Sequence, residues 1–106
     1  MKTDRELLEA AAKTAGLNVK AERVDADDRF IGLIVGPKHK NLKVDWNPLT
    51  DDGDALRLAV RLNIPIIPYD NETSTGTIGV VAKNWGSKEA NTRRAIVCAA
   101  AAMVAG

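Results

Sequence analysis

The sequence predicts an α+β protein built as a three-layer α/β/α sandwich, with three helices and a mainly antiparallel sheet of four or five strands. Helical and strand-like patterns alternate along the 106 residues in the order helix, two or three strands, helix, two strands, helix. The loops between strands are too short for crossover helices, which favours antiparallel pairing. Two strands are apolar on both faces, which favours a helix layer on each side of the sheet.

The composition indicates one ordinary globular domain spanning residues 1–106. Fifteen basic and fourteen acidic residues leave a net charge of +1, so no strong field attracts nucleic acid or an acidic membrane. The single cysteine excludes an internal disulfide. The charged N-terminus and the lack of an apolar run of about 20 residues predict no membrane contact and a cytoplasmic location.

The first half begins with a helix over residues 3–15. Thr3 and Glu6 form a capping-box pattern, apolar residues follow at helical spacing, and Gly16 is a natural stop. Strands are then expected at 19–24, 29–35 and 42–46, with turn residues at 25–28 and a basic loop at 38–41.

A second helix is expected to begin after the segment Trp46-Asn47-Pro48. Thr50 is predicted as its N-cap, and Asp51, Asp52 and Asp54 lie in or beside the first turn, where carboxylates meet the positive end of the helix dipole. The apolar stripe is Ala55, Leu58, Ala59 and Leu62, with Leu56 and Val60 widening it. Asn63 is the expected stop.

The second half alternates between extended and helical patterns. Residues 64–69 contain two prolines and predict an edge strand or an extended connection. Residues 70–76 read as a polar loop, and 77–83 as a strand apolar on both faces. A third helix should follow, capped by Ser87 or Asn91. From 95 to 105 it is apolar nearly all round, so it is either well buried or in contact with a partner chain.

Two segments carry a resemblance to a known family. The run Trp46-Asn47-Pro48-Leu49-Thr50-Asp51 at the start of a helix, and the Ala-rich helix at residues 91–101, resemble the phage α/β/α-sandwich ("ABA") domain family. The resemblance implies a small phage or prophage protein in the host cytoplasm. The family lends no catalytic residues, because it has no established activity.

Basic and aromatic residues are the main candidates for a binding site. Lys38, Lys40 and Lys43 lie at a predicted hairpin tip without an acid among them, and could contact phosphate or simply form a solvated turn. Arg93 and Arg94 lie near a helix N-terminus, where cations are disfavoured. They could meet an acidic partner or a phosphate, or bridge to the aspartates at 51–54, which we favour.

The two tryptophans have structural and functional interpretations. Trp46 could be a recognition aromatic, but its place at a strand end favours core packing. Trp85 lies in a polar break near basic residues, and core packing is again favoured over a contact with a partner.

The residue types favour binding over catalysis. His39 is the only histidine, and Cys98 lies in the Ala-rich helix like a small hydrophobe. The aspartates at 51–54 could hold a cation, but helix capping accounts for them, and a metal-dependent enzyme is the weakest alternative. We therefore expect a non-enzymatic protein without cofactor or metal, which binds a protein partner or itself. The alternative is a nucleic-acid-binding regulator that uses the hairpin at 38–43, Trp85, Arg93 and Arg94.

Overall fold

The computed structural model describes residues 2–37 and 42–104, and over these ranges it is an α+β fold with antiparallel strands, as predicted. The described elements, in chain order, are α1 (Asp4–Thr14), β1 (Asn18–Val24), β2 (Phe30–Gly36), β3 (Val44–Trp46), α2 (Asp52–Leu62), β4 (Ile67–Pro68), β5 (Glu72–Ser74), a 3₁₀ turn (Gly76–Ile78), β6 (Val81–Lys83) and α3 (Lys88–Ala102).

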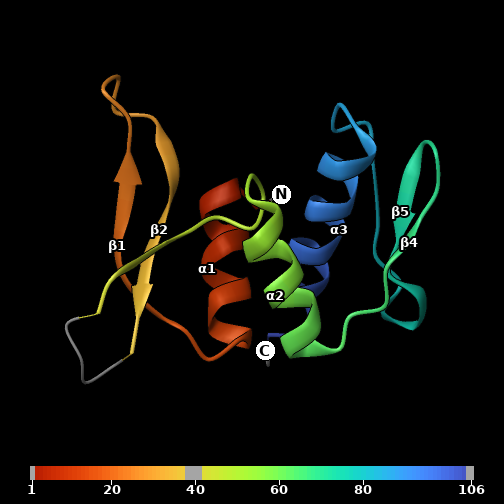
Figure 1. The fold of residues 1–106 in the computed structure, drawn as a ribbon, viewed down its shortest axis with the longest axis horizontal. Coiled ribbons are helices and arrows are strands. Elements are labelled where there is room, and N and C mark those ends of the chain that lie inside the picture. Colours follow the sequence, from red (N-terminus) through yellow and green to blue (C-terminus); the bar gives the residue numbers. More distant parts are fainter. Residues whose placement is uncertain (1, 38–41, 105–106) are drawn as a thin grey trace.

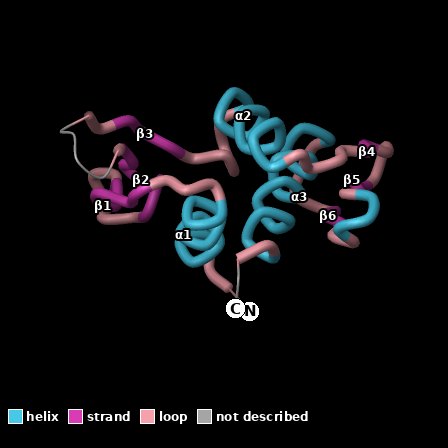
Figure 2. Tube along the Cα trace, turned by 90° about the horizontal axis from the view of Figure 1, so that it is seen from below, coloured by secondary structure: helices cyan, strands magenta, loops and turns pink. Residues whose placement is uncertain are grey.

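The strands of the described chain form two separate sheets, with orders β1-β2-β3 and β4-β5-β6. We call them sheet one and sheet two. The helices lie between them, with α1 packed on sheet one and α3 on sheet two (Figures 1 and 2). The predicted sandwich, with helices outside a single sheet of four or five strands, is not confirmed. The layers are reversed, with the helices inside and the sheets outside.

The predicted strand at 77–83 is formed only in part. Residues 76–78 make a 3₁₀ turn that closes at Gly79 with a φ of 83°, and only Val81–Lys83 pairs with a neighbour. Val81 is exposed while Ala82 is buried, so this strand has only one covered face. Three of the seven predicted residues thus form a strand, and they pair with β5 within sheet two.

Helix α1 begins as its sequence predicts. Thr3 and Glu6 form a capping box in which the Thr3 side chain accepts a hydrogen bond from the Glu6 backbone N–H. The bonds that Glu6 accepts from Thr3 lower the pKa of the Glu6 carboxyl. Gly16, with a φ of 75°, follows the end of the helix. Buried residues of α1 then pack into a core shared with β2, β3, α2 and α3.

The segment between β3 and α2 is a structural junction. Trp46 is buried, so its predicted core role is confirmed, and Pro48 is fully buried. The Asn47 side chain donates to the Ile31 carbonyl of β2 at 2.8 Å and accepts from the Leu49 N–H at 3.0 Å. Thr50 is not the N-cap of α2. Asp51 is, because its carboxylate accepts from the Asp54 N–H at 2.8 Å.

Sheet two contains a strand at residues that read as a polar loop. β5 (Glu72–Ser74) is its central strand, with Pro68 opposite Thr73 on one side and Ala82 opposite Thr73 on the other. Thr73 is fully buried, and its hydroxyl lies 3.0 Å from that of Thr92 on α3. A hydrogen bond between side chains thus takes the place of the apolar contact that is typical of a buried strand.

Helix α3 is covered by the protein itself. Ser87 is its N-cap, and Ala95, Val97, Ala99 and Ala100 are fully buried. α3 packs against both other helices, and the Thr14 hydroxyl of α1 donates to the Ala100 carbonyl at 2.8 Å. Of the two alternatives for the apolar stretch, burial within the chain is the one found over the described residues.

Candidate protein-binding surface

An apolar ridge runs along the solvent side of α2. It consists of Leu56 and Val60, whose exposed fractions are 60% and 69%. We call this pair the α2 ridge. The buried side of the same helix is formed by Ala55, Leu58 and Ala59. Side chains four residues apart lie on one face of a helix, so the ridge is a continuous apolar strip in water.

The sequence also carries a signal for this ridge. The predicted stripe of the helix includes Leu56 and Val60 as residues that widen it. At 100° per residue, however, they point away from the face on which Leu58 and Leu62 lie. In the structure α2 buries the face with Leu58 and exposes the face with Leu56 and Val60.

A hollow lies beside the ridge, between α2, α3 and the segment that contains β4. We call it the side groove. It has a volume of about 410 Å³, and its apolar lining comes from Ala55, Leu56, Ile66, Pro68 and Ile96. Charged residues also line it, namely Asp52, Lys88, Glu89 and Arg93. An apolar strip next to a hollow with charged residues around it is the arrangement typical of interaction surfaces.

Arg93 links the two helices that border the side groove. Its guanidinium donates to the Leu49 carbonyl at 2.9 Å and to the Asp52 carboxylate at 2.6 Å. The predicted bridge from this arginine to the aspartates at 51–54 is therefore confirmed. Only 20% of the Arg93 side chain is exposed. The two hydrogen bonds fix the position of this side chain at the edge of the side groove.

Arg94 does not join that bridge. It donates to the Asp4 carboxylate of α1 at 2.6 Å, and its guanidinium lies 3.9 Å from the centroid of the Trp85 ring. Trp85 is 51% exposed, so the favoured core role is wrong. The ring packs on a guanidinium rather than in the core, in a cation–π arrangement.

Of the basic residues predicted at the hairpin, the structure describes Lys43, which is not brought to this region. Lys38, Lys40 and His39 lie outside the described residues, while Lys43 is exposed just before β3 of sheet one. Trp85, Arg93 and Arg94 lie at the start of α3, which packs on sheet two. Sheets one and two are on opposite sides of the helices (Figures 1 and 2). Among the described residues, Lys43 is therefore not on the same face as Trp85, Arg93 and Arg94.

The three aspartates of α2 all have structural partners. Asp51 caps the helix and Asp52 pairs with Arg93. Asp54 is buried and accepts from the Asn47 N–H at 2.9 Å and from Arg57 at 2.7 Å. Within residues 2–37 and 42–104 no group of three or more histidine, cysteine or acidic side chains could hold a metal ion.

Cys98 is half-buried on α3. Burial raises the pKa of its thiol, and the nearby Arg94 opposes this effect only in part. The thiolate, which is the nucleophilic form, is therefore disfavoured at neutral pH. The interpretation of Cys98 as a small hydrophobe agrees with this environment.

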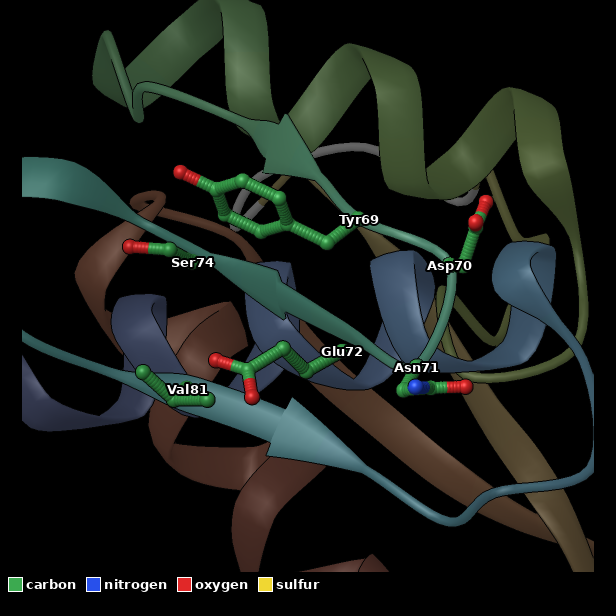
Figure 3. A pocket seen from close by; sticks show the side chains of 6 residues that line it. All are labelled: Tyr69, Asp70, Asn71, Glu72, Ser74 and Val81. Atoms are coloured by element: carbon green, nitrogen blue, oxygen red, sulfur yellow. The ribbon is translucent and has the colours of Figure 1, made fainter.

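A second, more open hollow of about 530 Å³ lies on sheet two, and it is lined by Tyr69, Asp70, Asn71, Glu72, Ser74 and Val81. Figure 3 shows these side chains in front of the sheet, with the helices behind it. Its polar groups are partly engaged within the protein, since Ser74 accepts from the Gly76 N–H and Asp70 lies 3.4 Å from the Lys88 ammonium. This hollow has less apolar character than the side groove.

Comparison with known proteins returned no match: no family model matches the chain, no curated protein matches it, and no solved structure matches it. The resemblance of residues 46–51 and 91–101 to the phage ABA family therefore stays a prediction. Each helix in the described part of the chain is too short or too polar to cross a membrane.

Proposed function

We propose that the protein is a non-enzymatic binding protein whose α2 ridge and side groove dock another protein. The observation that carries this proposal is the exposure of Leu56 and Val60 directly beside the side groove. Burying such apolar area against a partner contributes about 25 cal/mol per Å² before the costs of association. We further propose a cytoplasmic location and, on the resemblance of the junction segment alone, a phage or prophage origin.

The chemistry of the surface supports a protein partner over other classes of ligand. Its centre is aliphatic, and the charged residues that line the groove include two cations, Lys88 and Arg93, and two anions, Asp52 and Glu89. A nucleic-acid surface would need an excess of cations aimed at phosphates. Arg93 and Arg94 are instead committed to carboxylates of the protein itself. Nucleic-acid binding remains the alternative proposal, with a gel shift at low salt as its test.

The proposal predicts that the double variant Leu56→Glu/Val60→Glu loses its partner while remaining folded. Both positions are exposed, so the free energy of unfolding should change by no more than about 1 kcal/mol. Loss of central apolar anchors should weaken binding by at least about tenfold. The measurement compares proteins captured from source-cell extract by the wild type and by the variant, followed by affinities for each purified candidate.

The control is Val24→Glu, which alters another exposed apolar residue, 50% exposed, on β1 of sheet one. It should capture the same protein as the wild type. A partner that binds the ridge variant as tightly as the wild type would refute the proposed surface. Light scattering of the wild type and the ridge variant tests self-association, since only the wild type should dimerise if the partner is a second copy.

A further inference from the structure

We draw no further inference here: the strongest candidate, the α2 ridge with the side groove between α2, α3 and the β4 segment, carries nothing beyond the proposed function, because charged residues of both signs line the groove and nothing in the structure shows what covers the ridge.

Discussion

At the scale of single residues, Asp54 shows how the junction before α2 is held. Its side chain is 12% exposed, and its two carboxylate oxygens accept from different parts of the chain, the Asn47 N–H and the Arg57 guanidinium. The sequence alone places Asp54 in the first turn of a helix, where an acidic side chain is usually exposed to solvent. It does not indicate which of three aspartates turns inward, because that depends on the path of the Asn47-Pro48 turn.

Asp54→Ala should therefore lower the free energy of unfolding by about 2 kcal/mol, since it leaves the Asn47 N–H without its charged acceptor. Asp70→Ala is the control, because the Asp70 side chain is 94% exposed and its contact with Lys88 is long at 3.4 Å. Its effect should stay within about 0.5 kcal/mol. Urea denaturation of both variants makes the comparison. Equal effects would mean that Asp54 is only another acid at the helix start.

At the scale of elements, the helices were predictable and the small strands were not. The helices carry local signals, such as the capping pair Thr3 and Glu6 and the left-handed stop at Asn63, with a φ of 54°. β5 has no such signal, because its burial depends on Thr73 meeting Thr92 on a helix that begins 15 residues later in the chain. Strand patterns report apolar burial and miss a strand whose buried face is a hydroxyl pair.

The contact between Thr73 and Thr92 can be tested with a double-mutant cycle. Thr73→Val and Thr92→Val should each lower the free energy of unfolding by about 1 kcal/mol, because each leaves one hydroxyl without its partner. The double variant should cost no more than either single one, since both hydroxyls are then gone. Thermal unfolding of the four proteins completes the cycle. Strictly additive losses would show that the two hydroxyls do not stabilise one another.

At the scale of the whole molecule, the placement of the sheets decides where a partner can bind. Because the helices lie between the sheets, α2 presents its outer side to water instead of to a second layer (Figure 1). The side groove needs α2, α3 and the β4 segment together, so no local pattern could have predicted it.

The close approach of the helices is also a property of the whole chain, and it yields a final prediction. Ala11 and Ala12 of α1 and Ala99 and Ala100 of α3 are fully buried, so small side chains let the first and last helices pack closely. Ala100→Leu should lower the free energy of unfolding by about 1–3 kcal/mol through overpacking.

Ala102→Leu makes the same substitution at an exposed position of the same helix, where leucine and alanine have similar helix propensity. It should change the free energy of unfolding by less than about 0.5 kcal/mol. Chemical denaturation followed by far-ultraviolet circular dichroism measures both variants. If Ala100→Leu is as well tolerated as Ala102→Leu, the two helices do not pack as closely as the buried alanines require, and the shared core between the two sheets would be looser than the structure shows.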